Sequence, residues 1–162
     1  MHPSDYRVGH GFDAHRLAEG RPFILGGVRI PHETGPLGHS DADVLAHAVA
    51  DALLGACALG DLGGHFPDTD PQWAGADSMR LLAAVHELVV RHGWTIANID
   101  ATVVVERPKL AAYLAPMRDG LADALTLEVA QISVKAKTSE GMGYTGDGRG
   151  IAAYAVAMVR RL

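Results

Sequence analysis

Cysteine is almost absent from this sequence. Cys57 is the only one among 162 residues, so no disulfide can form within the chain. A lone thiol is compatible with a reducing compartment. No apolar run approaches the roughly 20 residues that span a bilayer. The first residues lack both the apolar stretch of a signal peptide and the Arg/Ser-rich composition of a transit peptide. These absences together predict a cytoplasmic protein with no membrane partner.

Positive charge is also in short supply. Lysine and arginine total 14 against 19 aspartate and glutamate residues, which gives a formal net charge of −5. Such a balance argues against a broad nucleic-acid-binding face. The apolar fraction of 48% and the length of 162 residues suit one globular unit with a sizeable core. We therefore expect a single domain, residues 1–162, that does not bind nucleic acid.

The hydrophobic pattern predicts strands that alternate with helices, and hence an α+β or α/β domain. Gly9 and Gly11 in the first strand predict close approach of another backbone, and Gly26-Gly27 predicts a bend or turn in the second. Strands are expected at 6–17, 23–30, 96–105, 132–137 and 151–159. Helices are expected from about residue 40 to 58, from 77 or 78 to 91, and at 114–125. Loops are expected at 31–40, 61–75 and 138–150.

The most informative motif is Asp13-Ala-His15, with His47 in a helical pattern downstream. Residues i and i+2 of a strand share a face, so Asp13 and His15 stand side by side. A third ligand from the helix would leave one tetrahedral position open, as in a catalytic zinc site. On the same helix flank, Asp51 is placed to accept the second ring N–H of His47. The alternative is a turn-capping aspartate, a surface histidine and a buried histidine.

His39 and Ser40 precede the expected helix, where free N–H groups favour phosphate. Ser40 to Asp43 also reads as a capping box, which alone would explain the serine. Asp61, Asp68 and Asp70 lie in tight turns. Their carboxylates suit polyol hydroxyls or a hard cation, although Asx-turns explain such residues equally well.

The segment from Lys135 to Gly150 combines hydroxyls, cations, carboxylates and many glycines. That mixture suits a diphosphate with Mg²⁺, and a mobile surface loop is the alternative. It matches neither the Walker A nor the Rossmann pattern. Glu106 to Leu110 follows a strand and is either a nucleotide-binding corner or a charged turn.

Taken in order, these motifs resemble one family over nearly the whole chain, the 2-C-methyl-D-erythritol 2,4-cyclodiphosphate synthases of the non-mevalonate isoprenoid pathway. The ordered set is far more specific than any one piece. It consists of Gly9 to His15, Gly38 to His47, Asp61-Leu-Gly63, Phe66 to Asp70, Arg107 to Leu110 and Lys135 to Gly150. The resemblance implies an α+β single domain whose mixed sheet is packed on one side by helices, with its strands facing the axis of a homotrimer and active sites between subunits.

The resemblance also implies roles for individual residues. Asp13, His15 and His47 bind Zn²⁺, and Glu140 binds Mg²⁺ (or Mn²⁺). His39 and Thr138 are the catalytic residues, which orient the substrate and stabilise developing charge. The remaining implied substrate contacts are Ser40, Asp61, Gly63, Phe66, Asp68, Asp70, Arg107, Pro108, Lys109, Leu110, Lys137, Ser139 and Tyr144.

The implied reaction is that of a phosphorus–oxygen lyase. The 2-phosphate of 4-diphosphocytidyl-2-C-methyl-D-erythritol 2-phosphate attacks its own β-phosphorus, expels CMP and closes a cyclic diphosphate. Nucleophile and electrophile are both anionic, so catalysis is expected to consist of positioning and charge neutralisation. The alternatives are a zinc-dependent phosphohydrolase and a non-catalytic, nucleotide-binding trimeric scaffold.

Two features depart from the family pattern. The glycine-rich loop, often Gly-Arg-Gly-Glu-Gly in the family, here reads Gly146-Asp147-Gly148-Arg149-Gly150, with the charges exchanged. The exchange puts in doubt a family site on the trimer axis for an isoprenoid diphosphate. Lys137 stands where a small hydroxyl residue is common, which adds a potential phosphate contact.

Overall fold

The computed structural model describes residues 5–162, so the prediction about a leader segment falls partly outside the described residues. A five-stranded sheet has the order β4-β1-β7-β5-β6. Neighbouring strands are antiparallel except for the parallel pair β5 and β6. The bounds are β1 (Tyr6–Glu19), β4 (Thr34–Pro36), β5 (Trp94–Val104), β6 (Ile132–Lys137) and β7 (Gly150–Arg161). The predicted mixed sheet is confirmed.

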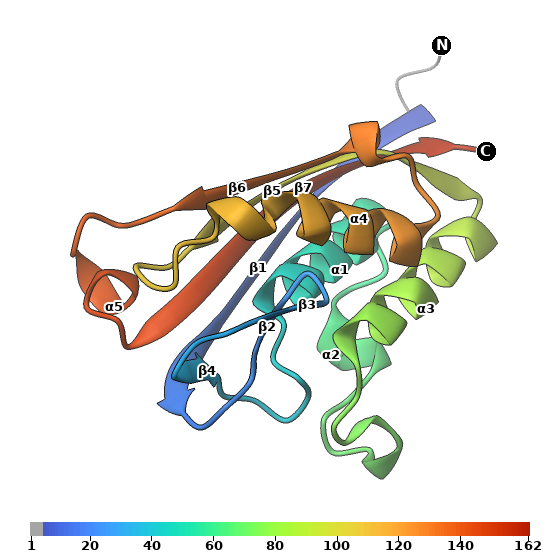
Figure 1. The fold of residues 1–162 in the computed structure, drawn as a ribbon. Coiled ribbons are helices and arrows are strands. Elements are labelled where there is room, and N and C mark those ends of the chain that lie inside the picture. Colours follow the sequence, from blue (N-terminus) through green and yellow to red (C-terminus); the bar gives the residue numbers. More distant parts are fainter. Residues whose placement is uncertain (1–4) are drawn as a thin grey trace.

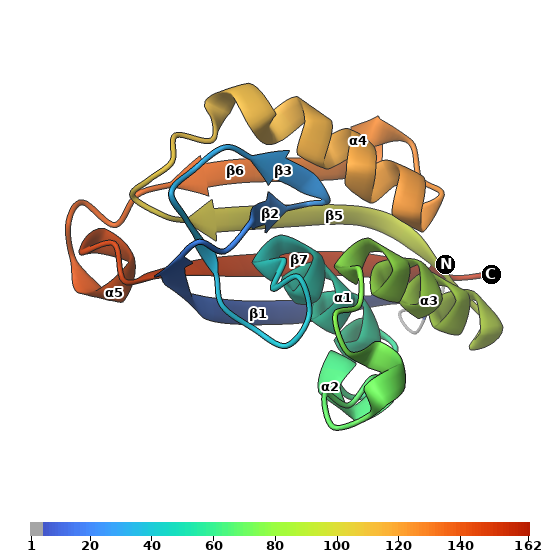
Figure 2. The same ribbon diagram turned by 60° about the horizontal axis from the view of Figure 1, so that its bottom comes forward.

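Three long helices cover one face of this sheet, and the opposite face carries no helix of the described chain (Figures 1 and 2). They are α1 (Val44–Ala56), α3 (Ser78–Arg91) and α4 (Leu114–Leu125). Shorter helical turns are α2 (Leu62–His65), α5 (Gly143–Gly146) and 3₁₀ turns at Pro71–Trp73, Ala111–Tyr113 and Val129–Gln131. No helix among residues 5–162 combines the length and apolarity needed to cross a membrane.

Alternation along β7 shows why the two faces differ. Ala153, Ala155 and Ala157 face the helices and are buried, whereas Tyr154 and Val156 point the other way and are 43% and 45% exposed. The small alanine side chains let α1 lie close to the sheet. The alanine-rich segment predicted as a strand is therefore a strand, and its period of two separates a core face from an open face.

Gly9 and Gly11 bring α1 even closer to β1. A Cβ at Gly9 would lie 1.9 Å from the carbonyl oxygen of Ala52, and one at Gly11 would lie 1.9 Å from that of Ala48. Both distances are far below van der Waals contact, so only glycine permits this separation. The predicted close backbone approach is confirmed, and its partner is the helix that carries His47.

Asp43 fixes where α1 begins. Its carboxylate accepts hydrogen bonds from the N–H groups of Ala46 (3.0 Å), Gly26 (2.9 Å) and Gly27 (2.8 Å). One side chain thus caps α1 and ties it to the turn of the β2 (Phe23–Leu25) and β3 (Val28–Ile30) hairpin. The predicted capping box at Ser40 is wrong, because the cap lies three residues later; the Ser40 hydroxyl accepts the N–H of Ala42 instead.

The remaining differences concern turns. The predicted strand 23–30 is a hairpin, and its bend is at Gly26 and Gly27, whose φ angles of +56° and +75° favour glycine. The three predicted loops hold short regular elements: β4 in 31–40, α2 and a 3₁₀ turn in 61–75, and α5 in 138–150. Elements of three or four residues are too short for hydrophobic periodicity to reveal.

Candidate metal and substrate site

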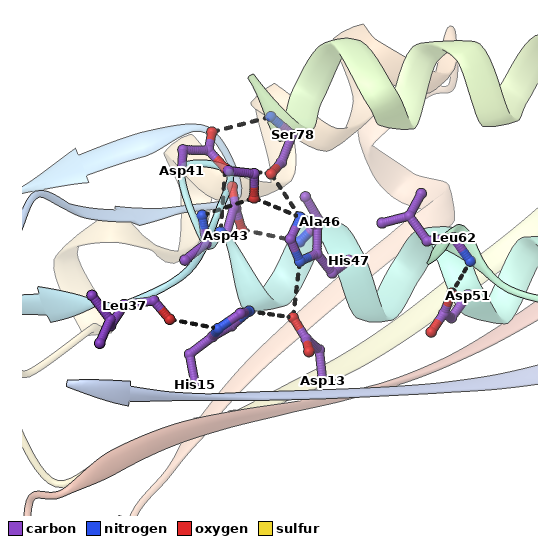
Figure 3. A network of polar contacts seen from close by, with 12 residues as sticks. Asp13, His15, Leu37, Asp41, Asp43, Ala46, His47, Asp51, Leu62 and Ser78 are labelled. Carbon is purple, nitrogen blue, oxygen red and sulfur yellow. Dashed lines mark hydrogen bonds and ion pairs between the residues drawn. The ribbon is translucent and has the colours of Figure 1, made fainter. Parts of the chain in front are cut away.

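Asp13, His15 and His47 converge, as the sequence predicted. The Oδ2 atom of Asp13 lies 3.0 Å from Nε2 of His15 and 2.9 Å from Nδ1 of His47. One potential ligand atom from each residue lies within 4.8 Å of the other two. Figure 3 shows the strand β1 presenting Asp13 and His15 toward the helix that carries His47. The close packing of α1 on β1 is what brings the third residue within reach.

The other nitrogen of each imidazole is held by the protein. Nδ1 of His15 donates to the carbonyl oxygen of Leu37 at 2.9 Å, and Nε2 of His47 lies 2.8 Å from the hydroxyl of Ser78. Both rings therefore turn their remaining nitrogen toward Asp13. The predicted role of Asp51 is wrong: its carboxylate accepts the backbone N–H of Leu62 at 2.7 Å, and the second ring nitrogen of His47 contacts Ser78.

Charge at the trio favours a cation. Burial opposes ionisation of Asp13, but hydrogen bonds from His15 and His47 outweigh it and lower the pKa of this carboxyl to about 2. The pKa of His15 is raised, mainly by its hydrogen bond to Asp13. An ionised carboxylate and two half-buried imidazoles form a donor set that suits a divalent transition metal. The three residues thus fit a metal centre.

The trio forms one wall of a cavity of about 410 Å³. His39 and Asp68 face each other beside it, with Nε2 and Oδ2 3.8 Å apart, and both are exposed. Phe66 and Trp73 stack edge to face, with ring centroids 4.9 Å apart. The cavity is lined by Asp13, His15, His39, Ser40, His47, Asp51, Leu62, Gly63, Phe66, Pro67, Asp68, Trp73 and Leu81.

Two of the predicted substrate contacts, Asp61 and Asp70, also make local caps. Asp61 accepts the N–H of Gly64 at 2.9 Å and begins α2. Asp70 accepts the N–H of Gln72 at 2.9 Å and begins a 3₁₀ turn. Neither lines the cavity. The two carboxylates shape the turns that carry Gly63, Phe66 and Asp68. In a single chain, Asp61 and Asp70 therefore act as turn-capping residues, which was the alternative considered for them.

A second cavity, of about 260 Å³, lies at the ends of β5 and β6. It shares no lining residue with the first. Arg107 is exposed and does not line it. The lining residues are Val105, Pro108, Lys109, Leu110, Ala111, Leu114, Ala136, Lys137 and Thr138.

The segment after β6 is exposed beside this second cavity. Thr138 Oγ1 lies 3.4 Å from Glu140 Oε1, and Glu140 has a φ of +54°. Ser139 shares a hydrogen bond of 2.6 Å with Thr145, and Tyr144 is 43% exposed. The predicted phosphate and magnesium groups thus lie together in sequence and space, but they do not line the cavity that holds Asp13.

The exchanged charges of the glycine-rich loop pair with each other. Nε of Arg149 lies 2.7 Å from Oδ2 of Asp147 in the same chain. The hydrogen bonds from Arg149 lower the pKa of the exposed Asp147 carboxyl. The arginine therefore already has a carboxylate partner within its own loop.

Sequence reasoning missed several residues of the first cavity. Trp73, Leu62 and Leu81 supply apolar wall, and Ser78 contacts His47. No periodicity marks Trp73, which stands in a turn. Ser78 carried only a helix-capping signal, and the cap is in fact Asp77, which accepts the N–H of Met79 at 2.9 Å.

The fold and this three-residue site point to one protein family. The model of the YgbB family matches residues 6–160, so the chain belongs to that family. A relative from Synechococcus elongatus, 58% identical over 98% of this chain and 99% of its own length, is a 2-C-methyl-D-erythritol 2,4-cyclodiphosphate synthase. The resemblance seen in the sequence motifs is thereby confirmed.

Solved structures agree. A 2C-methyl-D-erythritol-2,4-cyclodiphosphate synthase in its CDP-bound form superposes with a TM-score of 0.88 at 40% identity, over 94% of this chain and 99% of that one. The bifunctional IspDF from Campylobacter jejuni gives a TM-score of 0.93 at 39% identity; the match covers 97% of this chain but 42% of that longer protein. More than half of that longer protein therefore lies outside the match.

Proposed function

We propose that this chain is a phosphorus–oxygen lyase that converts 4-diphosphocytidyl-2-C-methyl-D-erythritol 2-phosphate to 2-C-methyl-D-erythritol 2,4-cyclodiphosphate and CMP. One oxygen of the 2-phosphate bonds to the β-phosphorus, and the bond from that phosphorus to the α-phosphate bridging oxygen breaks. CMP leaves with that oxygen. The observation that carries the proposal is the convergence of Asp13, His15 and His47 beside a cavity in a chain of this family.

Zn²⁺ is the metal that this donor set suits best, because three N/O ligands with an open position are typical of catalytic zinc. When bound, it would neutralise phosphate charge as a Lewis acid. Because the pKa of Asp13 is about 2, its carboxylate stays ionised, and thus able to bind a cation, over the physiological pH range. The cavity volume of about 410 Å³ is in the range of small-molecule sites.

Positioning is the task of the cavity walls. His39 and Ser40 line the cavity with the zinc trio, and we assign to them the 2-phosphate. Phe66 and Gly63 with their neighbours supply a mostly apolar surface for the methylerythritol part. Folding the substrate so that its two phosphates meet contributes several kcal/mol toward ring closure, because orientation entropy is lost on binding and not in the chemical step.

The second cavity suits the cytidine and the bridging phosphates. Pro108, Lys109 and Leu110 line it beside Lys137 and Thr138. We assign Mg²⁺ to Glu140 and stabilisation of developing charge to Thr138, with Arg107, Ser139 and Tyr144 as neighbouring contacts. The two cavities have no residue in common. The separation of the two sets of groups supports a site in which they come from different subunits.

The open face of the sheet supports a homotrimer. Val8, Phe12, Tyr154 and Val156 are 62%, 45%, 43% and 45% exposed on β1 and β7. Large apolar side chains gathered on one open face mark an interaction site. Its position on the face opposite the helices is the one that a trimer axis would cover. The predicted cytoplasmic location stays a prediction.

Product analysis tests the proposal. With Zn²⁺, Mg²⁺ and the substrate, we expect ³¹P NMR to show the cyclic diphosphate and CMP in equal amounts. Linear diphosphate or inorganic phosphate would instead indicate the phosphohydrolase. Absence of CMP release, together with unfolding on zinc removal, would indicate the scaffold.

Two histidine variants sharpen the assignment. His47→Ala is expected to lose zinc and turnover while the trimer survives. His92→Ala is the matched control, because His92 ends α3 and its ring contacts the carbonyl oxygen of Leu88 at 2.8 Å, outside the cavity. Full zinc content in His47→Ala would refute the assignment. For magnesium, Glu140→Gln is expected to weaken the Mg²⁺ response of turnover, and an unchanged response would remove that role.

A further inference from the structure

A chain of hydrogen bonds runs from His47 away from the cavity. Nε2 of His47 lies 2.8 Å from the Ser78 hydroxyl, and that hydroxyl donates a hydrogen bond to Oδ1 of Asp41. The backbone N–H of Ser78 donates to Oδ2 of the same carboxylate at 3.1 Å. Figure 3 shows the side chains of His47, Ser78 and Asp41 one after the other along this chain of hydrogen bonds, with Ser78 at the start of α3.

The chemistry of the groups fixes the direction of this chain. The Ser78 hydroxyl donates to Oδ1 of Asp41, so its single proton is committed to that carboxylate. The Ser78 oxygen is then left as an acceptor, and Nε2 of His47 must carry the proton that fills it. When an ion is bound and the proton is on Nε2, the neutral imidazole would offer its lone pair to that ion at Nδ1, the nitrogen that faces Asp13 at 2.9 Å.

Burial makes the arrangement rigid. Ser78 is 1% exposed, so water does not readily compete for its hydroxyl. The segment before α1 is also tied to the segment before α3: Asp41 donates its N–H to Ala76 at 3.4 Å, and Gly75 donates to His39 at 3.2 Å. Ser40 offers no equivalent support, because its hydroxyl is 3.5 Å from Nε2 of His47 and already accepts the N–H of Ala42.

We propose that Asp41 and Ser78 are positioning residues for the metal centre: they hold the proton of His47 on Nε2 and aim Nδ1 at the ion. This inference rests on the proposed zinc centre. It extends the site to a second helix, α3, and to a carboxylate that does not line the cavity. Partners of this kind orient a ligating imidazole and raise its basicity, and their removal typically weakens metal affinity by about 10–100-fold.

The test is zinc affinity, measured by competition with a chelating dye. Ser78→Ala is expected to weaken zinc binding by about 10–100-fold. Asp77→Ala is the matched control, because it removes the cap of α3, 2.9 Å from the N–H of Met79, and leaves the Ser78 hydroxyl in place. Affinity near that of the wild type is expected there. Equal weakening in both variants, or none in Ser78→Ala, would overturn the inference.

A measurement on the unmodified protein covers the case in which Ser78→Ala fails to fold. In ¹⁵N NMR spectra of the zinc-loaded wild type, His47 is expected to show a slowly exchanging proton on Nε2. A proton on Nδ1 would overturn the inference. Wild type that binds no zinc overturns the zinc centre and the inference together, whereas tight wild-type binding with an unaffected Ser78→Ala variant overturns the inference alone.

Discussion

Gly11→Ala tests whether the close packing of α1 on β1 builds the metal centre. The added Cβ would lie 1.9 Å from the carbonyl oxygen of Ala48, whereas real Cβ contacts essentially never fall below 3.0 Å. The helix must therefore retreat by at least 1.1 Å from the strand. The obstacle is backbone, so no side-chain rotation relieves it.

That displacement exceeds what a metal centre tolerates. His47 precedes Ala48 on the helix, and ligand distances hold within about 0.2 Å. Zinc affinity should fall by more than the roughly 100-fold typical of losing a supporting hydrogen bond. Overpacking of the core should also lower the free energy of unfolding by about 3 kcal/mol, the upper end of the usual range, since the clash is with backbone.

Gly55→Ala is the matched control on the same helix. Its Cβ would meet only the carbonyl oxygen of His10, at 3.9 Å, which is ordinary contact. Replacing a glycine inside a helix by alanine should raise the free energy of unfolding by about 0.5–1 kcal/mol, with zinc affinity unchanged. Denaturant unfolding and dye competition measure both quantities. If Gly11→Ala kept the stability and zinc affinity of the wild type, the packing argument would be refuted.

Three further predictions concern other parts of the structure. Asp43→Ala should lower the free energy of unfolding by at least about 3 kcal/mol in denaturant titrations, because three N–H groups lose their acceptor; a loss under 1 kcal/mol would contradict this. Zinc affinity, followed by calorimetry, should weaken as the pH falls, since the pKa of His15 is raised above 6.5 and protons compete with the metal; equal affinity at pH 8 and pH 6 would oppose it. Val156→Glu should dissociate the proposed trimer in sedimentation while the subunit stays folded, because this side chain is 45% exposed on the open face; a trimer that stays intact would exclude that face as the interface.

Long, regular elements were predictable from the sequence, because burial imposes a period on them. The strand of Asp13 and His15 and the helix of His47 follow from such patterns, and the strand β7 was favoured because Tyr154, Val156 and Met158 can share one face. The convergence of the trio was a hypothesis that needed the fold, since residues about thirty apart meet only when α1 lies on β1. Gly9 and Gly11 predicted that another backbone approaches this strand closely. A glycine does not indicate which element that is.

Contacts that depend on one hydrogen bond were not predictable. Asp43 and Asp51 share a helix flank with His47, yet Asp43 caps the helix and Asp51 binds the N–H of Leu62. The true partner of His47 is Ser78, from a helix that begins 31 residues later in the sequence. The pairing of carboxylates with donors depends on the local turns of the backbone. One such turn is at Ala42, whose φ of +56° is not predicted by any sequence pattern.

A crystal of the zinc-loaded protein, measured at the zinc absorption edge, tests the metal centre most directly. We expect one anomalous peak per chain, about 2.0–2.2 Å from Nε2 of His15, Nδ1 of His47 and a carboxylate oxygen of Asp13. A peak bound elsewhere, or one that leaves any of these three atoms out of its coordination, would contradict the account.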